Sequence, residues 1–145
     1  MSGPSVLSVA DRMGFYIFAA ALRSSDHYAI LEEAGPFTVF APTDAAFNEM
    51  SPMALDSFLR REREKLHLVL GYHFASGRVG AARFAGKRIR ATMRAGGAVI
   101  VDGRGGLKAN GARVIKPDLD AANGVVHGID ALLWPREPGG ALAVS

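Results

Sequence analysis

The side chains of this sequence that could do chemistry are a small set of histidines and carboxylates. His73 follows Tyr72 in an apolar stretch, and His127 lies three residues before Asp130. On a strand His127 and Asp130 would point to opposite faces, because side chains alternate with a period of two. Asp44 could join the two histidines only through the fold. We therefore expect no metal site and no cofactor.

The residues needed for nucleophilic catalysis are also missing. The chain has no cysteine, no G-x-S-x-G elbow and no S-x-x-K motif, so no serine has a visible activating partner. Gly103, Gly105 and Gly106 precede a predicted strand instead of opening a helix, which makes them turn residues and not a phosphate-binding loop. We expect a protein that is not an enzyme.

Length and composition are those of one globular domain. The chain has 145 residues, 49% of them hydrophobic and 21% charged, a balance that excludes a disordered or fibrous protein. Its longest apolar run, 15–22, is far shorter than the ~20 residues of a membrane-spanning helix. Residues 1–14 lack the features of a signal peptide. We predict a monomer with a single domain over 1–136 and a flexible tail over 137–145.

The elements that must position these residues begin with helices. One apolar series at helical spacing comprises Phe15, Phe18, Ala19 and Leu22. A second series, over 66–73, predicts a helix that carries His73 and stops near 76–77. Between them, the β-favouring run 37–40 is bounded by prolines and is expected to form a buried strand.

Two polar residues mark further helix starts. Thr43 or Asp44 can accept hydrogen bonds from the free amides of a short helix that contains Phe47. Ser51 is a second cap, because Pro52 after it suits the first helical position.

The second half of the sequence changes to a strand period. Residues 87–93 alternate, and 98–101 is a strand candidate. Asn110-Gly111 is a strong hairpin signal because both residues tolerate positive φ, and Asn123-Gly124 repeats it before 125–129. Helices followed by strands predict an α+β domain with a mostly antiparallel sheet.

Two segments resemble the two signature motifs of the fasciclin domain family. The first is GPFTVFAPTDAAF at 35–47, and the second is NGVVHGIDALLWP at 123–135. Between them, Tyr72-His73 resembles the family's central tyrosine–histidine motif. The order and spacing match as well, and the resemblance extends over 6–135, nearly the whole chain.

The resemblance implies a wedge of two β-sheets with N-terminal helices packed at its front, in a secreted or surface-attached protein that takes part in adhesion. It therefore implies an extracellular or periplasmic location, although a cytoplasmic one stays open without a signal peptide. The expected partners are a cell-surface or matrix protein or an acidic polysaccharide.

The resemblance also implies candidate binding residues. In some relatives the tyrosine–histidine motif, or an aspartate–isoleucine pair before the second signature, contributes to receptor binding. These correspond here to Tyr72 with His73 and to Asp118 with Leu119. The family pattern is broken at two positions: Lys116 stands where the best-studied adhesive version is acidic, and Gly128 replaces a branched residue. These departures weaken the implication of receptor binding by the second pair.

Each of these residues also has a structural interpretation. Tyr72 and His73 can bury an apolar body while the polar tip makes one hydrogen bond, and we favour this over direct partner contact. Thr43 and Asp44 are expected to cap a helix. His127 is expected on a strand of alternating character, hydrogen bonded to buried backbone or to the first signature segment.

The middle of the sequence is strongly basic. Residues 60–94 contain ten Lys and Arg against two Glu. On a strand, Arg88, Arg90 and Arg94 would share one face, with apolar side chains opposite. One interpretation is a solvated sheet face, and the other is a binding site for acidic polysaccharide or lipid headgroups. Nucleic acid is disfavoured because aromatic residues for base stacking are absent from this region.

Three functions remain open. The leading hypothesis is a non-catalytic adhesion or cell-surface interaction module. The alternatives are a carrier of a hydrophobic small molecule, held in an apolar groove between helices and sheet, and a polyanion binder that uses the basic strand face.

Overall fold

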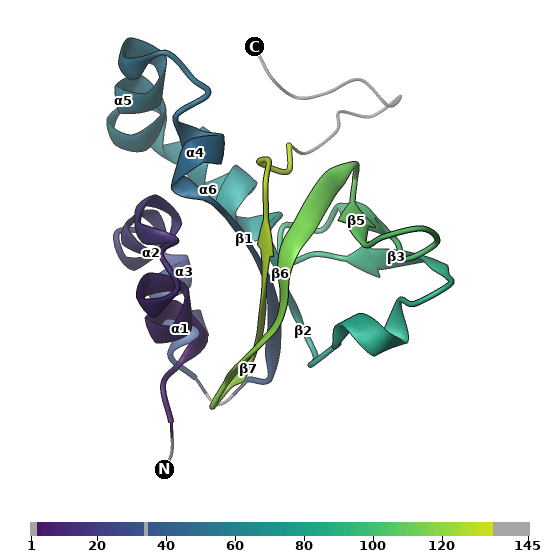
Figure 1. Ribbon diagram of the computed structural model, residues 1–145. Coiled ribbons are helices and arrows are strands. Elements are labelled where there is room, and N and C mark those ends of the chain that lie inside the picture. Colours follow the sequence, from purple (N-terminus) through teal and green to yellow (C-terminus); the bar gives the residue numbers. More distant parts are fainter. Residues whose placement is uncertain (1–2, 34, 135–145) are drawn as a thin grey trace.

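The computed structural model describes residues 3–33 and 35–134 (Figure 1). The helices are α1 (Val6–Arg12), α2 (Tyr16–Arg23), α3 (His27–Leu31), α4 (Asp44–Phe47), α5 (Pro52–Arg60), α6 (Arg63–Gly71) and the 3₁₀ helix η1 (Ala81–Arg83). The strands are β1 (Phe37–Pro42), β2 (Phe74–Ser76), β3 (Arg88–Thr92), β4 (Ala98–Asp102), β5 (Lys108–Ala109), β6 (Ala112–Ala121) and β7 (Gly124–Ile129). The tail predicted at 137–145 lies outside the described residues.

The two signature segments form neighbouring strands. β1 and β7 pair in parallel, with Val39 opposite Val126 and Phe40 opposite His127. The other neighbouring strands pair antiparallel, and the order is β2-β1-β7-β6-β5-β4-β3. The expected α+β fold with a mostly antiparallel sheet is confirmed.

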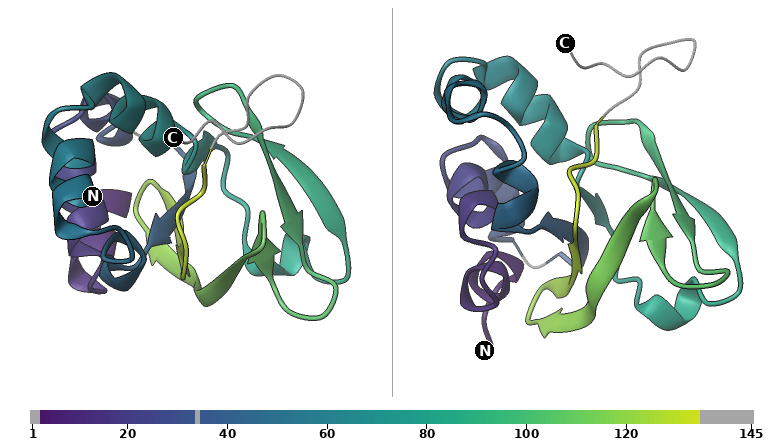
Figure 2. Two further views of the ribbon diagram at one scale, coloured as in Figure 1. Left: turned by 90° about the horizontal axis from the view of Figure 1, so that it is seen from above. Right: turned by 45° about the horizontal axis from the view of Figure 1, so that its top comes forward.

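The wedge arises at β6. The first residues of this strand pair with β5, whereas its remaining length pairs with β7. The sheet therefore turns along β6, and its two halves enclose a space between them. Figure 2 shows the α-helices on one side of β1 and β7, and η1 with the arm of β3, β4 and β5 on the other side. The two sheets implied by the resemblance are the halves of one sheet joined at β6.

The two sides of the central strands serve different cores. Phe37, Val39 and Ala41 of β1 belong to the core under the helices, together with Phe18 and Leu70. Phe40 lies in the core inside the wedge, which consists of Phe40, Tyr72, Phe84, Met93, Val99, Val101, Ala109, Ala112, Ile129 and Leu133. Because side chains alternate along a strand, β1 is buried on both faces.

Local signals form the expected turns and caps. The Thr43 hydroxyl accepts a hydrogen bond from Ala46 N at 3.1 Å and so caps α4. Ser51 caps α5 in the same way, with Pro52 as the first helical residue. The hairpin at Asn110-Gly111 has φ of 47° and 87°, as the tight turn between β5 and β6 requires.

The helix predicted to carry His73 is shorter than expected. α6 ends at Gly71, and the amides of Tyr72 and His73 bond back over three residues, to Val69 and Leu70. The following residues form β2, which supplies the outer partner of β1. The helical spacing of the sequence could not show that the residues after His73 leave the helix to pair with the edge of β1.

The second hairpin signal is also displaced. Ala121 pairs with Gly124, so the turn consists of Ala122 and Asn123, and Gly124 is already in β7. A β-carbon at Gly124 would lie 2.1 Å from Phe37 O, so this glycine serves close strand approach and not turn conformation.

Candidate functional site

His73 is a fully buried residue in the turn between α6 and β2. Its Nε2 accepts a hydrogen bond from Leu133 N at 2.9 Å, so the proton is on Nδ1, which donates to Val69 O at 2.7 Å. Burial lowers the pKa of His73 to about 4, against 6.5 for a free side chain, although the bond to Val69 opposes the shift. The neutral ring thus connects the end of α6 to the segment after β7.

Tyr72 is buried as well, at 2% exposure. Its hydroxyl donates to Ala98 O at the start of β4, and its ring belongs to the core inside the wedge. Tyr72 and His73 therefore hold different layers of the fold together. Neither side chain presents a surface that a partner could contact without a rearrangement.

His127 occupies the middle of β7 and is fully buried. Its Nδ1 accepts from Asp118 N at 3.1 Å, so Nε2 carries the proton and donates to Val79 O at 2.9 Å. Burial is also the main cause that lowers the pKa of His127. Both bonds are to backbone, as expected, but the partners Asp118 and Val79 are exposed and half-buried instead of buried. The expected alternation is wrong, because β7 is buried on both faces.

Asp118 lies where β6 departs from regular pairing. The register of β6 against β7 shifts between Val114 and Lys116 and again between Lys116 and Leu119. Asp118 has a φ of 58°, and its carboxylate accepts from Ala81 N at 2.8 Å. The side chain is exposed, while Leu119 turns inward against the core under the helices.

We call residues 115–118 the β6 bulge. All four side chains are exposed, and Ile115 is 47% exposed despite its apolar character. The segment is held in place through Asp118, whose amide and carboxylate bond to His127 and Ala81. The family resemblance named Asp118 as a candidate binding residue, but the strand pattern missed the irregular conformation of this segment, because the predicted strand stopped at 115. The charged and proline residues of KPD were the available signal of an irregular strand.

The remaining signature residues have structural partners. The Asp44 carboxylate accepts from Ile17 N at 2.8 Å and so joins α4 to the first turn of α2. Phe47 is fully buried in the core under the helices. Thr43 is the helix cap described above, and Asp130 accepts from Arg113 N at 2.9 Å.

Asn123 is a buried polar residue that no sequence pattern assigned to the core. Its Oδ1 accepts from Val6 N at 2.9 Å, and its Nδ2 donates to Leu31 O at 2.8 Å and Glu33 O at 2.9 Å. The first residue of the second signature therefore connects α1, the end of α3 and the β6–β7 turn. The Asn123-Gly124 dipeptide predicted only a turn and gave no sign of these hydrogen bonds.

The three arginines do not form one strand face. Arg88 and Arg90 are exposed on β3, and among the described residues neither forms an ion pair. Arg94 lies in the turn after β3, where its amide bonds to Phe74 O at 2.8 Å. The strand ends at Thr92 because the chain reverses there, with Met93 N bonded to Gly97 O. The predicted continuous row of three is wrong.

A further pair of histidines stacks beside Arg94. The rings of His27 and His67 are 4.0 Å apart and nearly parallel, and His27 Nε2 lies 2.9 Å from His67 O. Burial is the largest influence on His27 and lowers its pKa, and the charge of Arg94 acts in the same direction. Within residues 3–33 and 35–134 no group of three or more His, Asp and Glu could hold a metal ion.

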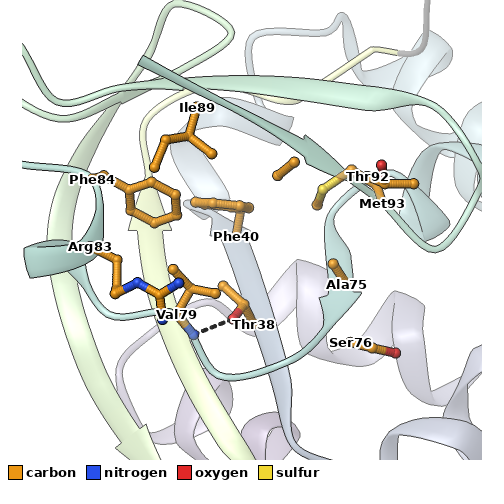
Figure 3. A pocket seen from close by; sticks show the side chains of 11 residues that line it. Thr38, Phe40, Ala75, Ser76, Val79, Arg83, Phe84, Ile89, Thr92 and Met93 are labelled. Carbon is orange, nitrogen blue, oxygen red and sulfur yellow. Dashed lines mark hydrogen bonds between the residues drawn. The ribbon is translucent and has the colours of Figure 1, made fainter. Parts of the chain in front are cut away.

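The wedge contains a pocket of about 250 Å³ between β1, β2, η1 and β3 (Figure 3). Its walls are largely apolar, and no α-helix lines it. The prediction of an apolar groove between the helices and the sheet is therefore wrong, because this pocket lies on the face of β1 that points away from the helices. Along the part of the chain that the structure describes, every helix is too short or too polar to cross a membrane.

Comparison with known proteins agrees with this geometry. The Fasciclin domain profile matches residues 13–135. Protein sll1483 of Synechocystis sp. is 38% identical over 125 residues, which cover 83% of this chain and 67% of that protein. The cell surface glycolipoprotein MPB83 of Mycobacterium bovis is 31% identical over 101 residues, covering 70% of this chain and 44% of its own length.

A solved structure shows the same fold. It is a FAS1 domain pair from the insect cell adhesion molecule fasciclin I, with a TM-score of 0.61 and 22% identity. The match covers 86% of this chain and 46% of that chain. With the profile match, the paired signature strands and the wedge, the chain belongs to the fasciclin domain family.

Proposed function

We propose that this protein is a non-catalytic surface-interaction module, placed outside the cytoplasm, that binds its partner through the β6 bulge. The observation that carries the proposal is an exposed, irregular strand segment that the buried core holds in one conformation. Ile115 offers an apolar contact, and Lys116 and Asp118 offer charges of both signs beside it.

Preorganisation supports this choice of surface. The Asp118 amide is bonded to His127, a residue with no exposure, and the Asp118 carboxylate is bonded to Ala81 N. A segment that is already ordered loses little conformational entropy on binding, so more of its contact energy contributes to affinity. The cell-surface description of MPB83 and the adhesion role of fasciclin I in its insect support the class of function.

Tyr72 and His73 enter the proposal as supports of the fold. Both are buried, with their polar atoms bonded to backbone. A change such as His73→Ala would reduce binding through loss of folded protein, so it is a poor test of a contact site. Substitutions at the exposed bulge separate contact from stability.

Adhesion of cells and of purified matrix proteins to the immobilised domain tests the proposal. Ile115→Ser should weaken binding about fivefold or more, the loss typical of a contributing interface residue. Met53→Ser is the matched control, because Met53 is 83% exposed on α5. Wild-type binding at the level of an albumin-coated surface, or equal binding of Ile115→Ser and wild type, would contradict the proposal.

An acidic polysaccharide is a possible partner of the same module. Arg88 and Arg90 expose two cations on β3 that lack an ion-pair partner among the described residues. They lie within the sequence region richest in basic residues. Two adjacent cations attract a polyanion with a strength that falls with salt.

The pocket inside the wedge favours a second candidate function, a carrier of a hydrophobic small molecule. Apolar walls around a volume of about 250 Å³ suit a small apolar ligand. Binding of an apolar fluorescent probe tests this candidate. The wild type should bind the probe, and the Ala91→Phe variant, whose larger side chain fills the pocket, should not. Unchanged probe binding in the variant would exclude this pocket as the site.

A further inference from the structure

The pocket inside the wedge has an apolar interior. Seven of its lining side chains are hydrophobic, and the largest are Phe40, Phe84, Ile89 and Met93. The seven come from β1, from β2, from the segment around η1, and from β3 and the turn after it. Figure 3 shows Phe40, Phe84, Ile89 and Met93 around an open space.

A single cation borders this interior. The Arg83 side chain leaves η1 and reaches beneath Phe84 toward Val79 and Thr38 (Figure 3). Among the described residues its guanidinium has neither a hydrogen-bond nor an ion-pair partner. Arg83 is therefore a charge-assisted donor that the protein itself does not use.

The other polar groups at the border differ in availability. The Thr38 hydroxyl is occupied, because it donates to Gly77 O at 2.6 Å and accepts from Val79 N at 2.9 Å. Ser76 and Thr92 have hydroxyls without a hydrogen-bond partner in the described part of the chain. Asp118 is the acidic residue bonded at the start of η1, and its carboxylate accepts from Ala81 N.

We infer that this pocket binds a small amphiphilic monocarboxylate, with its apolar body inside the wedge and its carboxylate on Arg83. The inference rests on the carrier function proposed above and names its ligand class. A medium-length aliphatic chain suits an apolar pocket of about 250 Å³ that is open to solvent on one side.

Charge selects the carboxylate over other small ligands. A neutral apolar molecule would fill the walls but gain nothing from Arg83, which is exposed and would stay hydrated. A phosphate dianion would face one guanidinium only, with hydroxyls as its further donors. A monocarboxylate matches the planar guanidinium, which binds carboxylates through two parallel N–H donors.

The inference is tested by titrating the full chain with octanoate and, separately, with neutral octanol. NMR chemical shifts and calorimetry measure the binding of each ligand. Octanoate should cause saturable shifts at pocket residues. Arg83→Gln should weaken octanoate binding about tenfold or more, the effect of losing a charge-assisted hydrogen bond. The same variant should leave octanol binding nearly unchanged. Arg61→Gln, which removes an exposed charge outside the pocket, should leave both ligands unaffected.

Each other outcome has a definite meaning. Equal weakening by Arg83→Gln and Arg61→Gln would overturn the assignment of Arg83, because net charge alone would explain it. Binding of octanol but not octanoate would overturn the anion and leave the carrier function in place. No saturable shift with either ligand would overturn both, without touching the surface-interaction proposal. Nuclear Overhauser contacts from octanoate to Phe84 and Met93 place the ligand even if Ala91→Phe fails to fold.

Discussion

At the level of single residues, the polar groups of the motif residues form hydrogen bonds within the protein. His73 and His127 are both neutral, buried and bonded through both ring nitrogens to backbone, with opposite tautomers. A ring in this state has no free lone pair for a metal or a substrate proton. Both rings stabilise the folded protein only in the neutral form, so their contribution to the free energy of unfolding should depend on pH.

Acid should destabilise the protein through His73. Folding lowers the pKa of His73 from 6.5 to about 4, so protonation favours the unfolded chain. Its contribution is complete above pH 6.5 and decreases as the pH falls toward 4. Between pH 7 and pH 5 the free energy of unfolding should fall by about 2 kcal/mol on account of this ring.

Urea unfolding at both pH values measures this loss. The variant His73→Gln, less stable throughout, should show a smaller difference between pH 7 and pH 5 than the wild type. His27 and His127 are retained in both proteins, so their own pH dependence cancels in the comparison. An identical pH dependence in the two proteins would mean that His73 titrates normally in the folded state.

Asn123 should be a residue of high structural importance. Asn123→Ala removes three hydrogen bonds to backbone and leaves the buried Val6 amide and Leu31 carbonyl, and the partly buried Glu33 carbonyl, without them. We expect a loss of about 2–3 kcal/mol in unfolding free energy. Asn48→Ala is the control, because Asn48 is exposed at the end of α4. Comparable melting temperatures for the two variants would refute the role of Asn123.

Residue roles were predictable where they depend on local geometry. The Thr43 cap and the Ser51-Pro52 start followed from side chains that bond amides a few residues away. The role of Asn123 was not predictable, since its partners are up to 117 residues distant in sequence. Likewise, burial of His73 depends on Leu133, which only the fold brings near.

At the scale of elements, Gly128 explains a departure from the family pattern. A β-carbon at Gly128 would lie 2.4 Å from the ring of Phe15, the buried residue that precedes α2. Phe15 thus occupies the space that a branched side chain at position 128 would need. Gly128→Val should cost about 1–3 kcal/mol through overpacking.

A second substitution should relieve this crowding. In Phe15→Ala/Gly128→Val the new side chain gains room, so the double variant should be more stable than the sum of the single effects predicts. Thermal or urea unfolding of the four proteins gives the interaction energy. Additive effects would show that Phe15 and Gly128 do not share this space.

Element boundaries were less predictable than element types. The helical series over 66–73 and the alternation over 87–93 identified α6 and β3, but α6 stops at Gly71 and β3 stops at Thr92. After α6 the chain pairs with β1 as β2, and after β3 it reverses, with Met93 N bonded to Gly97 O and Arg94 N bonded to the distant Phe74 O. The β6 bulge was missed because its conformation depends on His127 in the next strand.

At the scale of the whole molecule, an uneven charge distribution predicts behaviour on a polyanion. With a net charge of +3, the domain should be retained on heparin at low salt. Arg88→Glu/Arg90→Glu should elute at lower salt than Arg60→Glu/Arg61→Glu, which changes the net charge equally on another face. Equal elution of the two variants would show that β3 has no special part.

The overall architecture was the most predictable level. The signature segments predicted two buried strands, and β1 and β7 are neighbours in the sheet. The turn of the sheet at β6 and the pocket inside it were beyond sequence patterns, since they arise from register shifts and from side chains of four separate elements. The sites that we propose for interaction are therefore the β6 bulge, the two arginines of β3 and this pocket.

We infer that His73 and His127 are neutral residues with a structural role. Long-range ¹H–¹⁵N NMR of their side chains, followed from pH 8 to pH 4, measures both properties. We predict a Nδ1–H tautomer for His73, a Nε2–H tautomer for His127, and no titration of His73 until the pH approaches about 4. A His73 ring that exchanges tautomers freely and titrates near 6.5 would contradict the account.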